Sequence, residues 1–285
     1  MDAAERALLE DALRKSLTTC GPEAEPGAAL AELGWAEMLA EEPDTAIPLV
    51  FRLLGETGAQ APVLNDVVLL AAGRPLGGTP PLPYAGGAWV RWARGDRAPT
   101  GPLDPGLPLR HAEPGDLPAP AVAAGRRALG WWLLGAGRAM LALAREHVLD
   151  REQFGRPLAS FQALRHRLAE TYVALEAAEA VLVAAAAPET DRSAGENTEA
   201  PDSVDALDHT SALLAKAAAG RAALTAARHC QQALGGIGFT AEHALHRHVK
   251  RALVLDGLLG STRELTREAG RLLLRETRAP RLIDL

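Results

Sequence analysis

Apolar residues recur every three or four positions through the first 73 residues, for example at Leu13 and Leu17 and again at Leu49 and Leu53. This spacing places them on one face of an α-helix. The polar residues between them then face solvent. The pattern predicts an N-terminal helical domain over residues 1–74.

The pattern changes between residues 75 and 120. This segment holds more than half of the chain's 20 prolines and many glycines, which interrupt helices and central strands. Only two short stretches, Ala88 to Trp92 and Leu107 to His111, have the composition of strands. We therefore expect a loop-rich middle segment with too little strand sequence for a full β domain.

Long Ala- and Leu-rich runs follow, and their period is again helical. The polar stretch from Pro188 to Ser203 reads as an exposed connection between two of them. Ser261 with Glu264 three residues later forms a capping-box pattern. We expect helices from Val122 to about Asp150, Leu158 to Ala187, Val204 to Leu234, Glu242 to Leu258 and Ser261 to Thr277. These helices predict a mainly α protein with a C-terminal four-helix bundle over residues 121–285.

Charge and composition narrow the functional classes. Lys plus Arg number 30 against 36 Asp plus Glu, a net charge of −6, which argues against nucleic acid or an anionic membrane as the partner. No apolar run reaches membrane-spanning length, and the acidic start of the chain is unlike a signal peptide. Cys20 and Cys230 are expected to be free thiols. We expect a cytoplasmic protein.

Two motifs about 80 residues apart offer ligand-binding chemistry. One reads Arg-Glu-Gln-Phe-Gly-Arg-Pro-Leu-Ala-Ser-Phe-Gln over residues 151–162, and the other Gln-Ala-Leu-Gly-Gly-Ile-Gly-Phe-Thr-Ala-Glu-His over residues 232–243. An Arg at a helix end presents a fork of donors to pyrophosphate oxygens, and a Gly-Gly turn lets a ligand approach the backbone. Because these glycines follow a helix, they are not a Rossmann fingerprint. Both motifs suit a dinucleotide.

In this order the motifs resemble the R-x-x-F-G-x-P-L-x-x-F-Q and Q-x-x-G-G-x-G-F-T-x-E-H patterns of acyl-CoA dehydrogenases. Weaker similarity covers residues 30–35 and 54–58, whereas the family's middle β domain has no full counterpart. The resemblance implies FAD as cofactor and an acyl-CoA thioester as substrate. Taken alone, Arg151 also suits a helix C-terminus and Phe154 a core aromatic. Carried over by position, the flavin contacts fall on Arg151, Gln153, Phe154, Gln232, Gly235, Gly236 and Ser261.

The family's reaction needs a carboxylate that removes a proton alpha to the thioester while the flavin accepts a hydride. The position of that Glu is occupied here by Leu259, ahead of Gly260 and Ser261, and the alternative position used by some relatives falls at about Gly125. Neither residue can accept a proton. Asp256 and Glu264 are the nearest substitutes, but an exposed charge and a helix cap explain them better.

The chain keeps the family's helical domains but lacks a full β domain and a base. In this it resembles the smaller subunits of heteromeric α2β2 acyl-CoA dehydrogenases, which occur in actinobacterial steroid and sterol side-chain degradation. This implies an unlike partner subunit with an intact middle domain, in a dimer or tetramer formed through the C-terminal helices. Two alternatives remain open. The chain is otherwise a non-enzymatic homodimer derived from the same fold, or a stand-alone dehydrogenase with a relocated base.

Three further groups were weighed for function. The spacing of His243, His246 and His248 matches no standard zinc motif, and we expect no metal site. Trp131 and Trp132 fit a helix interface better than an acyl pocket. The basic residues Arg126 and Arg127 suit either CoA phosphates or a solvated helix terminus, and the sequence does not decide between these roles.

Overall fold

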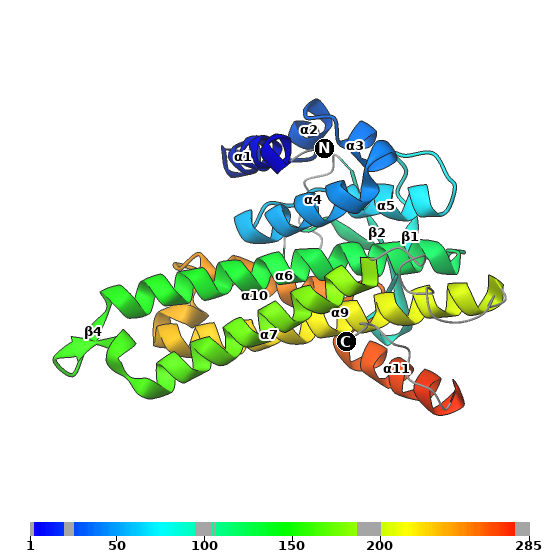
Figure 1. Cartoon of the computed structure of the whole chain (residues 1–285). Coiled ribbons are helices and arrows are strands. Elements are labelled where there is room, and N and C mark those ends of the chain that lie inside the picture. Colours follow the sequence, from blue (N-terminus) through cyan, green and yellow to red (C-terminus); the bar gives the residue numbers. More distant parts are fainter. Residues whose placement is uncertain (1–2, 20–25, 95–103, 105, 187–200, 277–285) are drawn as a thin grey trace.

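The protein is described here by a computed structural model that covers residues 3–19, 26–94, 104, 106–186 and 201–276. It is mainly helical, as predicted, with a group of N-terminal helices seated on a long helical bundle (Figure 1). The N-terminal helices are α1 (Ala3–Thr19), α2 (Pro26–Glu32), α3 (Trp35–Glu41), α4 (Pro43–Thr57) and α5 (Val63–Ala71).

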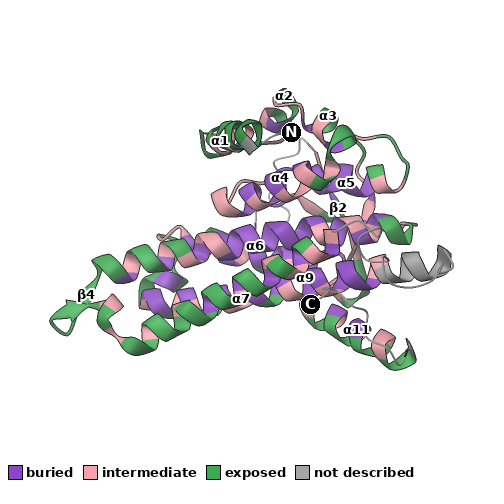
Figure 2. Cartoon of the chain, in the orientation of Figure 1, coloured by how far each residue is buried: buried purple, intermediate pink, exposed green. Residues whose placement is uncertain are grey.

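The bundle consists of α6 (Ala119–Asp150), α7 (Gln162–Ala186), α9 (Pro201–Leu234) and α10 (Leu245–Gly257). Helix α6 is central, because it packs on α4 and α5 as well as on α7, α9 and α10. Figure 2 accordingly shows the middle of α6 buried and its C-terminal end exposed. Trp132 is fully buried there, stacked on Trp92 and edge-on to Phe51. Trp132 therefore packs in the interior between helices, as the sequence predicted.

Two glycines allow α4 to cross α6 at close range. A Cβ added at Gly55 would lie 2.3 Å from the carbonyl oxygen of Trp132, and one at Gly135 would lie 2.1 Å from that of Arg52. Such distances leave no room for any side chain at either position. The crossing fixes the N-terminal domain on the bundle.

The middle segment contains a three-stranded antiparallel sheet in the order β1 (Pro81–Tyr84), β2 (Ala88–Trp92) and β3 (Leu109–His111). The two expected strands are present, but β1 was missed because two of its four residues are prolines. Proline is tolerated in β1 because this strand lies at the edge of the sheet. The sheet confirms a much reduced β segment.

Helix α11 (Thr262–Glu276) follows the bundle and projects from it (Figure 1). Its capping box is as predicted: the Ser261 backbone N–H donates to the Glu264 carboxylate at 2.9 Å, and the Glu264 N–H donates to the Ser261 hydroxyl at 3.4 Å. The expected helix ends differ in detail. Helix α7 begins four residues late, after the short 3-10 helix η2 (Leu158–Ser160), and α10 begins at Leu245.

The predicted connection from Pro188 to Ser203 is shorter than expected at its C-terminal end, because α9 already begins at Pro201. Its residues 188–200 lie outside the described part of the chain, as does Cys20. Cys230 is a free, buried thiol whose pKa is raised by burial to about 12. No helix in the described ranges is long and apolar enough to cross a membrane.

Candidate functional site

The two sequence motifs meet at one end of the bundle. Arg151 follows the last residue of α6, and its backbone N–H donates to the carbonyl oxygen of His147 at 2.9 Å. The glycine-rich turn η3 (Gly235–Phe239) follows the last residue of α9. Arg151 and His243, which is the last residue of the second motif, line the same cavity. The fold thus brings together residues that are more than 80 positions apart.

The first motif forms a short hairpin of β4 (Glu152–Gln153) and β5 (Arg156–Pro157). Phe154 and Gly155 form its turn with positive φ angles of 57° and 75°, as a two-residue type I′ turn requires. Phe154 is 90% exposed, so it is no core aromatic. Its ring lies edge-on to Phe161 at 6.2 Å, and the guanidinium of Arg156 lies over the Phe161 ring, 4.2 Å from its centroid.

The second motif exposes its backbone at the adjacent end of α9. Gly235 has a φ of 64°, which ends the helix in the left-handed region. A side chain added at Gly235 or Gly236 would meet no atom within 4 Å, whereas one at Gly238 would collide with the Gln231 carbonyl oxygen at 2.7 Å. Gly238 is therefore required for packing. Gly235, Gly236 and the exposed Gln232 face open space.

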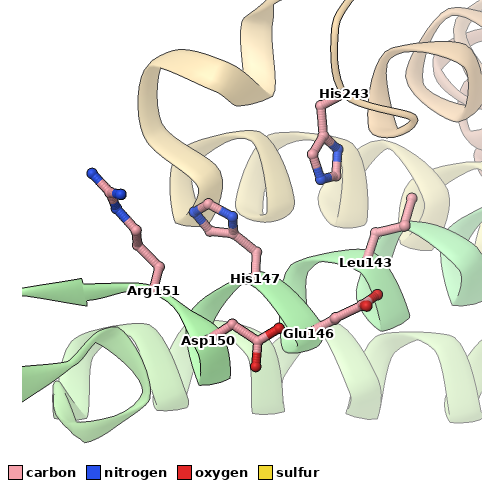
Figure 3. Close-up of a pocket in the computed structure, with 6 residues that line it drawn as sticks. All are labelled: Leu143, Glu146, His147, Asp150, Arg151 and His243. Atoms are coloured by element: carbon pink, nitrogen blue, oxygen red, sulfur yellow. The ribbon is translucent and has the colours of Figure 1, made fainter.

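The cavity at this end measures about 360 Å³ and is lined by Leu143, Glu146, His147, Asp150, Arg151 and His243 (Figure 3). The imidazole rings of His147 and His243 lie 6.3 Å apart and nearly perpendicular. Burial lowers the pKa of His147, and the neighbouring His243 and Arg151 lower it further. Nδ1 of His243 accepts the backbone N–H of Leu245, so its other nitrogen is free to donate.

The two positions that the resemblance assigns to the base, Gly125 and Leu259, lie side by side near the start of α6, away from this cavity. A Cβ added at Gly125 would lie 2.5 Å from Cδ1 of Leu259, and 3.0 Å from the side chain of Val68. Leu259 is 1% exposed and has a positive φ of 54°. Its backbone N–H donates to Pro83 of β1 at 2.8 Å. An aliphatic side chain therefore fills the space beside Gly125, held there by the remnant sheet.

Both substitute carboxylates are engaged in capping. Asp256 accepts the backbone N–H and the hydroxyl of Thr262 at the start of α11. Glu264 accepts from Ser261 and also from the backbone N–H of Gly86 at 2.8 Å. These hydrogen bonds hold the pKa of Glu264 below its usual range. Each carboxylate thus has a structural task that accounts for its position.

Two buried basic side chains beneath the Leu259 loop were not anticipated from the sequence. Nζ of Lys216, on α9, is fully buried and donates to the carbonyl oxygens of Asp256 at 2.9 Å and Gly260 at 2.5 Å. The guanidinium of Arg126 donates to the carbonyl oxygen of Leu259 at 3.1 Å. The sequence signal for this buried site was a single Lys within the otherwise uncharged run from Thr210 to Gly220. Arg126 therefore does not meet a CoA phosphate, and Arg127 pairs with Asp208.

The histidine cluster of the second motif is dispersed. His248 is buried beside Gly58, and burial lowers its pKa to about 4. His243 lines the cavity, while Nδ1 of His246 lies 2.8 Å from the His243 carbonyl oxygen. Across the described ranges, no three His, Cys, Asp or Glu side chains are grouped closely enough to hold a metal ion.

Comparison with known proteins agrees with this geometry. Residues 119–271, more than half of the chain, match the family described as acyl-CoA dehydrogenase, C-terminal domain. The chain belongs to the acyl-CoA dehydrogenase family. Acyl-CoA dehydrogenase IpdE2 of Mycobacterium tuberculosis is 35% identical over 186 residues, which are 64% of this chain and 53% of that protein. The chain therefore spans about half the length of this relative.

Solved acyl-CoA dehydrogenase structures share the fold over nearly the whole chain. The ChsE4-ChsE5 complex from Mycobacterium tuberculosis aligns with a TM-score of 0.64 and 19% identity, covering 98% of this chain and 99% of that one. A glutaryl-CoA dehydrogenase from Mycobacterium smegmatis in complex with FADH2 aligns with a TM-score of 0.64 and 15% identity, covering 96% and 95%. At these identities the likeness establishes the acyl-CoA dehydrogenase fold.

Proposed function

We propose that this chain is a subunit of an FAD-dependent acyl-CoA dehydrogenase that works with an unlike catalytic chain. The partner would supply the carboxylate base and the intact middle domain, and this chain would supply contacts to one end of the flavin. The substrate class is an acyl-CoA thioester, with a steroid or lipid side chain as the acyl group. The ChsE4-ChsE5 complex is a precedent for two unlike chains on this fold.

The contact between Leu259 and Gly125 carries this proposal. A dehydrogenase needs a proton acceptor above the substrate, and both positions that serve this purpose in the family hold residues that cannot accept a proton. Their side-chain space is closed by Leu259 and Val68. Proton abstraction by this chain would require a group that the described residues do not place there.

The bundle end fits the outer part of a dinucleotide. The guanidinium of Arg151 is exposed, with no hydrogen bond or ion pair to any described residue, and can face pyrophosphate oxygens. Gly235 and Gly236 offer open backbone, and Phe154 offers an exposed ring. When bound, FAD would supply the hydride acceptor for the reaction. Gln153 and Gln232 are further exposed donors here.

The two regions are too far apart for one flavin. At 1.5 Å per residue, Gly125 and Arg151 lie roughly 40 Å apart along α6, which exceeds the length of an extended dinucleotide. Ser261 lies with the distant region and has its hydroxyl engaged by Glu264. The flavin touched by Arg151 would therefore have its ring over another subunit, and Ser261 would not contact that flavin.

The experiment is co-expression with an unlike acyl-CoA dehydrogenase chain that has the middle domain and the catalytic carboxylate. FAD affinity and acyl-CoA oxidation are then measured. Arg151→Gln should weaken FAD binding by the complex about tenfold or more, because a charged hydrogen bond contributes roughly 1.5–3 kcal/mol. Arg145→Gln, an exposed control on α6, should change it less than about twofold.

Three results would count against the proposal. These are a failure of the two chains to associate, full activity of the partner alone, and unchanged FAD affinity of the Arg151→Gln variant in an intact complex. A colourless homodimer that takes up no flavin beside any partner would favour the non-enzymatic alternative. Activity of the lone chain that Glu264→Gln or Asp256→Asn abolishes would favour a relocated base.

A further inference from the structure

Helix α11 carries a row of arginines on the face opposite its packed side. Leu265 and Ala269 are buried against the bundle, and α11 packs mainly on α9. Four exposed arginines recur at every fourth position: Arg263, Arg267, Arg271 and Arg275. At 1.5 Å per residue the row extends roughly 18 Å. Figure 2 shows the outer side of this projecting helix as exposed.

These arginines have no directly bonded counter-charge among the described residues. None of the four makes an ion pair or a side-chain hydrogen bond with a residue that the structure describes. The two described carboxylates of α11 are committed elsewhere, Glu264 to Ser261 and Gly86, and Glu268 to His209 and Arg126. Arg271 helps to lower the pKa of Glu268, but no described carboxylate is bonded directly to an arginine of the row.

The row also works against the stability of the helix. Residues four apart are neighbours on a helix surface, so each successive pair of these arginines is repulsive. The helix dipole favours Arg271 and Arg275 in the last turns, but it offers nothing to Arg263 near the N-terminus. Leu274 lies between the arginines on the same face and is 81% exposed. Burying such an apolar side chain in a contact is favourable, and arginine is enriched among the residues that carry binding energy at interfaces.

We infer that the exposed face of α11 is a docking surface for an acidic protein surface. Arg263, Arg267, Arg271 and Arg275 would pair with a row of carboxylates, and Leu274 would be buried at the C-terminal end of the contact. The chain as a whole carries a net charge of −6, which disfavours long polyanions such as nucleic acid but does not oppose a short, local contact. This surface lies apart from the bundle end that holds Arg151.

The test measures binding of the full-length chain to a fluorescein-labelled oligoglutamate peptide long enough to span the roughly 18 Å row. Duplex DNA and phosphatidylglycerol vesicles serve as competing probes. The test variant replaces the row with neutral residues: Arg263→Gln, Arg267→Gln, Arg271→Gln and Arg275→Gln. The control variant changes the net charge equally at exposed arginines elsewhere: Arg91→Gln, Arg145→Gln, Arg221→Gln and Arg228→Gln.

We expect the test variant to weaken peptide binding about tenfold and the control variant less than about twofold. A variant with lysines in the four row positions keeps the charge and should retain binding. The row variant should unfold at the same or a higher temperature, because repulsion is removed. Equal losses in the two glutamine variants, no peptide binding by the wild type, or tighter row-dependent binding of DNA or vesicles would overturn the inference.

Discussion

At the scale of single residues, Leu259 occupies the position that the resemblance assigns to the catalytic base, and its side chain is packed. Leu259 is almost fully buried and touches Gly125, while its backbone is held by Pro83 and Arg126. Burying an aliphatic side chain is favourable, whereas an unpaired carboxylate in the same space would be costly. The buried leucine therefore stabilises this loop, whereas a carboxylate at the same position would destabilise it.

Truncation of this side chain should therefore affect stability and not activity. Leu259→Ala should lower the free energy of unfolding by about 2–4 kcal/mol, because it removes buried contacts and leaves a cavity. Leu253→Ala, at a position that is 44% exposed on α10, should cost less than about 1 kcal/mol. Chemical denaturation of both variants checks this. Equal effects at the two positions would show that Leu259 is not the packed residue described here.

Lys216 makes stability depend on pH. Burial lowers its pKa from 10.5 to about 7, so between these values the unfolded chain holds a proton that the folded chain has released. The free energy of unfolding should therefore rise with pH across this window, by about 1 kcal/mol per unit. Lys216→Met removes this contribution. Denaturation at pH about 7.5 and about 9.5 should show a rise about 2 kcal/mol larger in the wild type than in the variant. The prediction is wrong if the free energy of unfolding changes with pH equally in the wild type and in Lys216→Met.

At the scale of elements, the glycines in the helices have different roles. Gly55→Ala should destabilise the protein by about 2 kcal/mol or more, because the new methyl group would meet the backbone of α6. Gly270→Ala lies on α11 with open space around it and should stabilise by up to about 1 kcal/mol. Thermal unfolding of the two variants should shift in opposite directions. A shift of both in the same direction would contradict the tight crossing of α4 and α6.

The helices were the elements that the sequence predicted best. Helical periodicity located α6 through Asp150 and α9 through Leu234, and the capping box placed the start of α11. Strand β1 was missed because its prolines are acceptable only at a sheet edge, and edge position depends on the tertiary fold. The burial of Lys216 was missed for a similar reason. Its partners are carbonyl oxygens of a loop some 40 residues away, which no local pattern reveals.

The site could be predicted only in part. The sequence identified Arg151 and Gly236 as candidate ligands, and the bundle brings their segments to one end, although their contact with a flavin stays a prediction. The proximity of His147 to His243 could not be foreseen, because His147 lies on α6 and belongs to neither motif. Ser261 was assigned to the flavin by position alone, and the fold places it in the other region, with Glu264 as its partner.

At the scale of the whole molecule, the retained and the lost features belong to different regions. The helical framework and the exposed bundle end are intact, while the middle sheet is reduced to three short strands and the base positions are filled. The proposed function accounts for both features: this chain would support a flavin that another subunit uses, and an unlike chain would supply the carboxylate.

The most direct test is acyl-CoA-dependent flavin bleaching by the purified chain, supplied with excess FAD, with and without the unlike chain. The account predicts no bleaching by this chain alone, and full bleaching once a partner carrying the carboxylate is added. Rapid bleaching by this polypeptide on its own would contradict the central claim.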